Sequence, residues 1–239
     1  DLVRSRGLGD VYKRQTLLFD VDDTILDFQD TEDQALKALF EAHGLEMTPE
    51  RKQSYQTINH DLWQQFEQGK ITRDQVINER FGLFFETQGI QVDSPAVELA
   101  YREFLNEGHK LLDNSDEILA ELAQHFDLYV VTNGVSETQY RRLEDAKLKP
   151  YFRDIFVSED TGYQKPMKEY FDYVFARIPN VKKQETVIIG DSLTSDILGG
   201  QLAGIDTIWF NPKKKNSGEI QPTYAVSYTH LTLPTTPYV

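Results

Sequence analysis

The chain lacks cysteine and long apolar runs, and it is short of basic residues. The absence of cysteine from its 239 residues excludes disulfides, thiolate metal sites and cysteine nucleophiles, and it fits a reducing cytoplasm. No apolar run approaches the roughly 18 residues of a membrane-spanning helix. The 25 Lys and Arg residues face 39 Asp and Glu residues, giving a formal charge of −14, which repels nucleic acids and anionic membranes. We therefore expect a cytoplasmic protein that binds neither nucleic acid polymers nor membranes. We also expect it to be a monomer or a homodimer.

The two ends of the chain differ in sequence pattern from its middle. Residues 1–15 (DLVRSRGLGDVYKRQ) and 227–239 (SYTHLTLPTTPYV) show no periodicity, and both resemble translated sequencing-adapter text. We interpret them as non-native flanks and exclude them from the prediction of the fold. On this interpretation, a last strand predicted at residues 222–226 is cut off by the second flank.

Residues 28–108 carry the signals of four consecutive helices. Two Thr-x-x-Gln capping boxes and two pairs of a capping residue with proline mark helix starts, and four glycines mark helix ends. The boxes are Thr31-x-x-Gln34 and Thr72-x-x-Gln75, the pairs are Thr48-Pro49 and Ser94-Pro95, and the glycines are Gly44, Gly69, Gly89 and Gly108. Apolar residues recur at helical spacing between these signals. We predict a small helical bundle inserted into a second domain.

The remaining residues, 16–27 and 109–226, alternate between predicted strands and helices. Short apolar runs predict strands at 17–20, 128–132, 155–158, 186–190 and 205–210, and helices are predicted at 114–126, 136–148, 166–178 and 194–203. Such alternation is typical of a parallel sheet with helices on both faces. The predicted fold class is therefore α/β, with the helical bundle as an insert.

Two acidic residues follow the first predicted strand. Asp20 and Asp22 point the same way only if the chain is extended, because residues i and i+2 of a strand lie on one face. Ligands of parallel sheets bind outside the carboxyl ends of the strands. Two carboxylates placed together there need a cation or a shared proton, so this strand end is a candidate for a metal-assisted site.

A second pair of acids follows the strand at 186–190. Asp191 comes directly after three buried apolar residues and a glycine, whereas Asp196 falls in the first turn of the next predicted helix. Both can lean toward one cation from these positions. Asp196 has a plain alternative, because an acid in the first turn of a helix is favourable without any ligand.

Polar residues also end the strand at 128–132 and precede the helix predicted from 166. Thr132, Asn133 and Gly134 place a hydroxyl and an amide before a helix that we expect Ser136 to cap, which suits an anion, although an ordinary turn can use the same residues. Lys165 precedes Pro166, which favours an extended backbone and could direct the lysine over the sheet edge. A solvated lysine is the alternative.

Taken in order, these strand ends resemble the four motifs of the haloacid dehalogenase (HAD) superfamily. The motifs are Asp20-Val21-Asp22-Asp23-Thr24, Thr132-Asn133-Gly134, Lys165-Pro166, and Gly190-Asp191 through Asp196. The resemblance spans residues 16 to about 212. It implies a Rossmann-like α/β core, and it makes the helical insert at 28–108 similar to the mobile cap of that superfamily.

The resemblance also implies a mechanism of phosphate-ester hydrolysis. Asp20 would attack phosphorus to form an aspartyl-phosphate, and Asp22 would protonate the leaving oxygen and then activate water. Mg²⁺ would be bound by Asp20, the backbone carbonyl of Asp22, and Asp191, with Asp196 in support. Lys165, Thr132 and Asn133 would stabilise charge on the phosphoryl group. The superfamily's dehalogenases lack an acid at the position of Asp22, which favours a phosphatase.

Within the superfamily, the motifs and part of the insert look most like the bacterial pyrimidine 5′-nucleotidases. That likeness implies a small-molecule phosphate ester as substrate, namely a nucleoside monophosphate. Asn59, Trp63 and Arg80 are candidate substrate contacts in the insert, although aromatic residues at helical spacing are commonly bundle core. Sugar-phosphate and N-acylneuraminate-phosphate phosphatases share the catalytic residues and stay open, and a phosphomutase is only weakly excluded.

Two non-enzymatic interpretations remain. A receiver-type signalling domain also has a phosphorylatable aspartate, Mg²⁺ and a nearby lysine, but it has no use for Asp22 or for an insert of about 80 residues. A phosphate-binding module that has lost activity would be expected to lack a catalytic group, and every group is present.

Overall fold

The computed structural model describes residues 15–226 of the chain. The predicted flanks, 1–15 and 227–239, lie outside the described residues except for Gln15. The backbone of Gln15 bonds to Glu185 and Asp127, extending the hydrogen bonding of the sheet by one residue. The described chain forms two units: one contains the residues up to Asp27 and from Lys110 onward, and the other is Phe28–His109.

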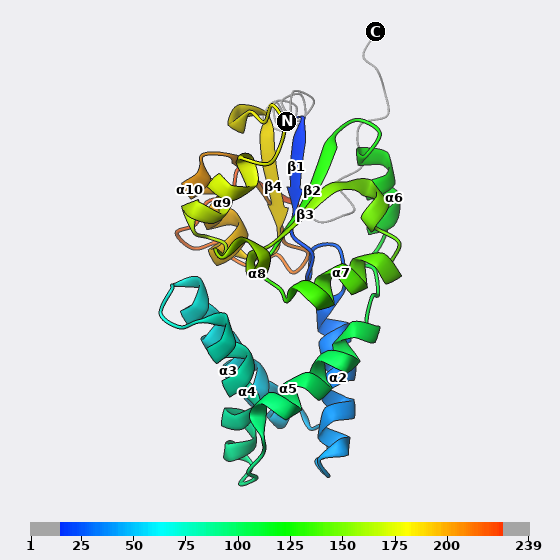
Figure 1. Ribbon diagram of the computed structural model, residues 1–239, viewed down its shortest axis with the longest axis vertical. Coiled ribbons are helices and arrows are strands. Elements are labelled where there is room, and N and C mark those ends of the chain that lie inside the picture. The colour runs from blue at the N-terminus through cyan, green and yellow to red at the C-terminus, as the bar shows by residue number, and fades with distance from the viewer. Residues whose placement is uncertain (1–14, 227–239) are drawn as a thin grey trace. The chain divides into compact units, whose positions relative to one another are not determined.

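The larger unit contains a six-stranded sheet in which every paired strand is parallel to its neighbour (Figure 1). Its strands are β1 (Thr16–Phe19), β2 (Asp127–Thr132), β3 (Phe152–Val157), β4 (Thr186–Gly190), β5 (Asp206–Phe210) and β6 (Tyr224–Val226). The order across the sheet is β3-β2-β1-β4-β5-β6. The order reverses between β1 and β4, and such a switch point is where open α/β sheets bind ligands. The predicted α/β class with a Rossmann-like parallel sheet is confirmed.

Helices cover both faces of this sheet because its strands are apolar on both sides. Leu17 and Phe19 of β1 pack with α6 (Ser115–Leu122) and α7 (Ser136–Asp145), whereas Leu18 packs with α9 (Lys168–Phe175) and α10 (Leu198–Ala203). In Figure 1 these two pairs of helices lie on opposite sides of the sheet. The short elements are α8 (Ser158–Thr161), the 3₁₀ turns η1 (Lys149–Tyr151) and η2 (Lys183–Glu185), and the π-helical turn η3 (Leu193–Ile197).

The smaller unit is a bundle of α2 (Phe28–Ala42), α3 (Pro49–Glu67), α4 (Arg73–Thr87) and α5 (Ser94–Glu107). Its core is apolar and largely aromatic, with Phe40 stacked on Phe84 and Tyr55 stacked on Phe81. Helix α2 packs on α5, α3 on α4, and α4 on α5. The glycines predicted to end the first three helices, Gly44, Gly69 and Gly89, all have positive φ, as a left-handed helix terminus requires.

Two predicted helix starts in the bundle are correct and two are wrong. Thr48 caps α3, and Thr72 forms the predicted capping box with Gln75 on α4. Thr31 is instead inside α2, which begins at Phe28. Helix α5 is capped by Asp93 rather than Ser94, because the Ser94 hydroxyl accepts a hydrogen bond from the backbone of Gly82 on α4.

The helices of the larger unit are shorter than predicted. Helix α6 ends at Leu122, before the predicted end at residue 126, and α7 ends at Asp145 rather than at 148. Helix α9 begins at Lys168, so Pro166 lies before the helix and not at its first position. The segment predicted as one helix at 194–203 opens with the wider η3 turn before α10.

The chain leaves the larger unit and returns to it at one place. The backbone N–H of Asp27 donates to the carbonyl of Lys110 (2.8 Å), and the Lys110 ammonium lies 3.0 Å from the Asp27 carboxylate. Leu26 also forms an isolated antiparallel bridge with Leu111. The two crossings are therefore bonded to each other.

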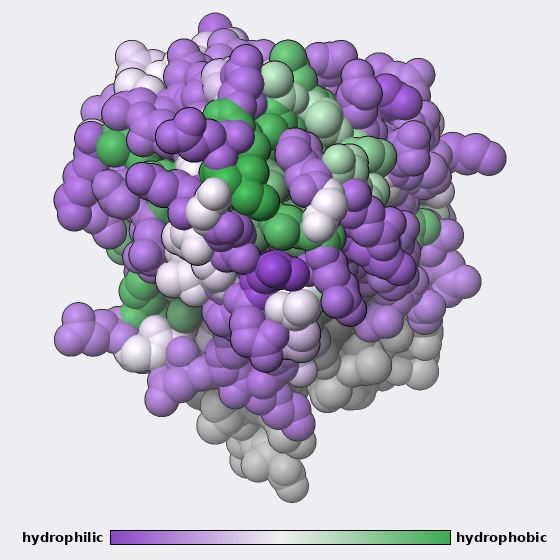
Figure 2. Space-filling view, turned by 90° about the horizontal axis from the view of Figure 1, so that it is seen from below, coloured by the Kyte–Doolittle hydropathy of each residue, from purple (hydrophilic) through white to green (hydrophobic). Residues whose placement is uncertain are grey.

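The face in Figure 2 is mostly hydrophilic, with apolar residues exposed in several places. Among residues 15–226, no helix combines the length and the apolar character needed to cross a membrane.

Candidate active site

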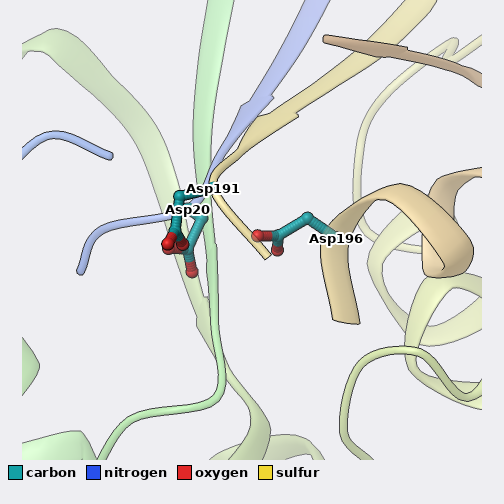
Figure 3. Close-up of side chains that lie close together, drawn as sticks. All are labelled: Asp20, Asp191 and Asp196. Carbon is teal, nitrogen blue, oxygen red and sulfur yellow. The ribbon is translucent and has the colours of Figure 1, made fainter. Parts of the chain in front are cut away.

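Three carboxylates from separate segments meet at the switch point of the sheet. Asp20 follows β1, Asp191 follows β4, and Asp196 lies in the η3 turn. One oxygen from each lies within 4.8 Å of an oxygen of both others. Figure 3 shows Asp20 and Asp191 side by side with Asp196 directed toward them. The structure thus brings together three of the four acids predicted at the first and last motifs, whereas the carboxylate of Asp22 has other partners.

Burial and crowding disfavour negative charge on these acids. Burial raises the pKa of Asp20 to about 8; nearby Lys165 opposes the rise, whereas Asp196 and Asp22 add to it. Burial, with the charges of Asp20 and Asp196, also raises the pKa of Asp191 well above its ordinary value. The cluster is therefore short of positive charge. Carboxylate oxygens are the ligands that Mg²⁺ prefers, so the residues present fit a divalent cation held by Asp20, Asp191 and Asp196.

Lys165 supplies one buried positive charge beside this cluster. Its ammonium donates to Asp20 Oδ1 (2.7 Å), Asp196 Oδ1 (2.6 Å) and the carbonyl of Val131 (2.7 Å). Although burial lowers the pKa of Lys165, Asp196 and Asp20 raise it above its ordinary value. The lysine is 1% exposed, so the alternative of a solvated lysine is wrong.

Asp196 is held in place by its backbone surroundings as well as by Lys165. Its second oxygen accepts from the backbone N–H of Ser192 (3.1 Å), and the residue is fully buried. A Cβ at position 190 would lie 2.2 Å from Asp196 Oδ2. Glycine at 190 therefore makes room for this carboxylate at the end of β4.

Thr132 and Asn133, at the end of β2, lie next to these groups. The Asn133 side chain donates to the carbonyl of Lys165 and accepts from its N–H, both at 2.9 Å. The Thr132 hydroxyl accepts from the N–H of Gly134 (3.1 Å) and from Gln139 Nε2 (3.2 Å). The sequence predicted Asn133 as a phosphate-binding residue and missed that its amide anchors Lys165.

The carboxylate of Asp22 binds to helix α7. It accepts from Arg142 Nη1 on one oxygen and from Gln139 Nε2 (2.5 Å) on the other. The sequence analysis did not predict Gln139 and Arg142 as partners of Asp22, because polar residues are common at such positions of an amphipathic helix. Their spacing of three residues, on the face that also carries buried Leu143, was the available signal.

The start of α7 is occupied by the protein's own acids. The N–H of Ser136 donates to Glu159 Oε2 (2.7 Å), and its hydroxyl donates to Asp160 Oδ1 (2.6 Å). Ser136 makes no side-chain cap, because Val135 is the N-cap residue. The expectation that Ser136 caps a helix start open to an anion is therefore wrong.

The three candidate residues of the insert lie in two places within the bundle. Arg80 binds Glu98 through two hydrogen bonds (2.8 and 2.7 Å) and donates to Asn59 Oδ1 (3.1 Å). Arg80 is 5% exposed and Glu98 is 1% exposed. Trp63 is half-buried and packs edge-on against Phe66. Arg80 is therefore engaged with residues of its own unit.

The chain is similar to a protein family, to curated proteins and to solved structures. The family model of haloacid dehalogenase-like hydrolases matches residues 17–210. A protein named as a HAD-hydrolase, YfnB of Bacillus subtilis, is 58% identical over 89% of this chain and 91% of its own length. A crystal structure of YfnB bound to magnesium has a TM-score of 0.86 and 57% identity, covering 89% of this chain and 94% of that one.

Two further relatives are named as pyrimidine 5′-nucleotidases. PynA of Streptococcus pneumoniae is 38% identical over 90% of this chain and 92% of its own length. YjjG of Escherichia coli is 32% identical over 90% of this chain and 94% of its own length. The chain is therefore similar to these proteins along almost the whole length of each.

Proposed function

The chain belongs to the family of haloacid dehalogenase-like hydrolases, and on that basis we propose that it is a Mg²⁺-dependent phosphatase of nucleoside 5′-monophosphates, with pyrimidine nucleotides as substrates. The observation that carries the proposal is the buried site at the end of β1, where Asp20 lies against Lys165 and two further carboxylates. The names of PynA and YjjG support the choice of substrate. Whether the substrate is a nucleotide or a sugar phosphate, it is a small phosphate ester.

The proposed reaction has two steps that share Asp20 and Asp22. First, a carboxylate oxygen of Asp20 bonds to phosphorus as the bond to the leaving oxygen breaks, and Asp22 gives that oxygen a proton. Second, a water oxygen bonds to phosphorus, the aspartyl bond breaks, and the water gives a proton to Asp22. Inorganic phosphate and the nucleoside leave, and both acids return to their starting states.

The positive charge that a phosphate dianion requires comes from two sources. Asp20 and Asp191, with Asp196 and the backbone carbonyl of Asp22, would hold Mg²⁺, which supplies positive charge beside the phosphoryl oxygens. Lys165 holds a second charge next to Asp20. We assign phosphate binding at the end of β2 to Thr132 and the backbone of Asn133.

The presence of Asp22 favours phosphate esters over compounds with carbon–halogen bonds as the substrates. A halide leaves without a proton, whereas an alkoxide oxygen needs one, and Asp22 is an acid placed two residues after the proposed nucleophile. Arg142 and Gln139 both bind its carboxylate. A receiver-type domain would have no comparable use for this residue.

The proposal is tested by measuring phosphate release from a panel of nucleoside monophosphates and sugar phosphates with Mg²⁺. We expect turnover of pyrimidine monophosphates that is lost with EDTA and falls by several orders of magnitude in Asp20→Asn. Turnover of sugar phosphates alone would keep the chemistry and reject the substrate. A folded, Mg²⁺-binding protein that releases no phosphate from any ester would overturn the proposal.

A further inference from the structure

Helix α7 presents two buried polar side chains to one carboxylate of the site. Gln139 and Arg142 are each 1% exposed, and they bind different oxygens of Asp22 from positions 117 and 120 residues away in the sequence. Burying an amide and a guanidinium is unfavourable unless their donors find partners. The Asp22 carboxylate supplies a partner to both.

The side-chain amide of Gln139 is oriented by the hydrogen bonds that it donates to residues at two strand ends. Its Nε2 donates to Asp22 Oδ2 (2.5 Å) and to the Thr132 hydroxyl (3.2 Å), joining the end of β1 to the end of β2. Its Oε1 is buried and accepts no hydrogen bond from the described residues. The amide is thus turned so that only its donor side is used.

Glycine at position 134 leaves the space that Gln139 occupies. A Cβ there would lie 2.2 Å from Gln139 Nε2 and 2.7 Å from its Cγ. The φ angle of Gly134 is not positive, so the backbone does not itself demand glycine. The turn after β2 is therefore shaped around this side chain.

We propose that Arg142 and Gln139 are positioning residues for Asp22, holding its carboxylate beside Thr132 so that it can reach the leaving oxygen of a bound phosphate ester. This inference rests on the proposed function, in which Asp22 protonates that oxygen while Asp20 forms the bond to phosphorus. A side chain with two single bonds between backbone and carboxylate has several rotamers. Two fixed donors on one helix select one of them before the substrate arrives.

Two substrates with different leaving groups distinguish this positioning role from a general contribution to folding. An alkoxide leaving from a nucleoside monophosphate needs the proton of Asp22, whereas the phenolate of p-nitrophenyl phosphate leaves without one. The ratio kcat/KM includes only the steps up to the first irreversible one, the departure of the leaving group. It therefore excludes the later step in which Asp22 receives a proton from water.

The test measures kcat/KM for uridine 5′-monophosphate and p-nitrophenyl phosphate in Arg142→Met and Gln139→Met. We expect Arg142→Met to lose about 10-fold to 100-fold with the nucleotide, as is usual when a group that orients a reacting residue is removed, and less than about threefold with the aryl phosphate. Gln139→Met should also lose more kcat/KM with the nucleotide than with the aryl phosphate, but the loss should be smaller than in Arg142→Met. Arg142→Lys, which keeps the charge but not the fork of donors, should recover part of the loss.

A double-mutant cycle with Asp22→Asn and a surface control completes the test. If Arg142 acts through Asp22, Arg142→Met should change nucleotide turnover less than about twofold in the Asp22→Asn background. Arg141→Met removes the neighbouring exposed arginine, which pairs with Asp145, and should match the wild type.

Equal losses with both substrates, or an undiminished loss in the Asp22→Asn background, would overturn the inference. If Arg142→Met does not fold, the same two criteria apply to Gln139→Met. A wild type that hydrolyses neither ester would instead reject the proposed function.

Discussion

The side chain of Asn133 and the backbone of Lys165 are joined by two reciprocal hydrogen bonds, both 2.9 Å long, across 32 residues of sequence. The amide occupies both the N–H and the C=O of the lysine, so the loop that carries Lys165 is fixed to the end of β2. This anchoring places the ammonium between Asp20 and Asp196. The position of the buried charge thus depends on a residue that the sequence suggested only as a phosphate contact.

Removing this anchor should lower both activity and stability. In Asn133→Ala we expect kcat to fall about 10-fold to 100-fold, because Lys165 loses its fixed backbone. The free energy of unfolding should fall by about 2 kcal/mol, since each hydrogen bond contributes about 1 kcal/mol net. Steady-state kinetics and urea denaturation measure the two quantities.

A matched control for that variant exists on the loop after β5. Asn211 bonds to the N–H and C=O of Lys215 in the same reciprocal way, also at 2.9 Å. Asn211→Ala removes the same kind of anchor and should leave kcat unchanged. Equal kcat in the wild type and Asn133→Ala would show that the backbone anchor of Lys165 has no part in activity.

Gly190→Ala should disrupt the carboxylate cluster through one methyl group. The added Cβ would lie 2.2 Å from Asp196 Oδ2, so the acid must move and Lys165 loses a partner. We expect a loss of about 1 to 3 kcal/mol in stability, as is usual for overpacking, and weaker Mg²⁺ binding by calorimetry. Gly82→Ala is the control, because its Cβ would meet Ser94 at 3.2 Å, away from any carboxylate. Unchanged Mg²⁺ affinity in Gly190→Ala would contradict the assignment of Asp196 to the cation site.

Mg²⁺ binding should release protons below about pH 8. Without metal, the pKa of Asp20 is raised from 3.8 to about 8, so the folded protein keeps a proton that the unfolded chain loses. The stabilising contribution of this group is complete below about pH 4 and declines as the pH rises to about 8. The cation competes with this proton, so its affinity should rise up to about pH 8 and then level off.

Calorimetry at pH 7 in buffers of different ionisation enthalpy measures the protons released, and thermal unfolding measures the stabilisation. Mg²⁺ should raise Tm more at pH 8 than at pH 6. An enthalpy of binding independent of the buffer would mean that no proton is displaced, which contradicts the raised pKa. Ca²⁺ serves as a control for the dependence on charge alone, since it also takes oxygen ligands.

The buried pair of Arg80 and Glu98 should be required for the stability of the helical bundle. Arg80→Met leaves the carboxylate of Glu98 buried with Arg102 as its one remaining partner among residues 15–226, which should cost about 3 to 5 kcal/mol. Replacing both residues, as Arg80→Met with Glu98→Leu, should recover part of this loss. Lys149→Met is the control, because its pair with Glu144 is exposed and contributes less than about 1 kcal/mol. An Arg80→Met protein as stable as the wild type would show that the pair is dispensable.

The strand-end residues could be predicted from the sequence because their placement follows from a general property of parallel sheets. Apolar runs that end in Asp20 and Asp191 put both acids at one edge in any fold of this class. The buried position of Lys165 could not be predicted in the same way, because it depends on the loop that Asn133 anchors. The sequence alone suggested only that proline would hold its backbone extended.

Contacts of long sequence separation account for what the sequence did not predict. Gln139 and Arg142 are buried because Asp22 lies opposite them. Their spacing puts them on the buried face of α7, but it does not identify a partner more than 100 residues earlier. Ser94 and Asp93 can both cap a helix, and the choice between them is made by the backbone of Gly82 on another helix. Local signals fixed the existence of these elements, whereas tertiary contacts fixed their ends and their partners.

The bonded crossing of Asp27 and Lys110 bears on how such a protein can change through evolution. The helical bundle begins and ends beside one hydrogen-bonded pair, so in the topology of the core it takes the place of a surface loop. An insert attached in this way can be lengthened, replaced or lost without a change in the path of any strand. Selection on the bundle and selection on the acids at the strand ends can therefore proceed separately.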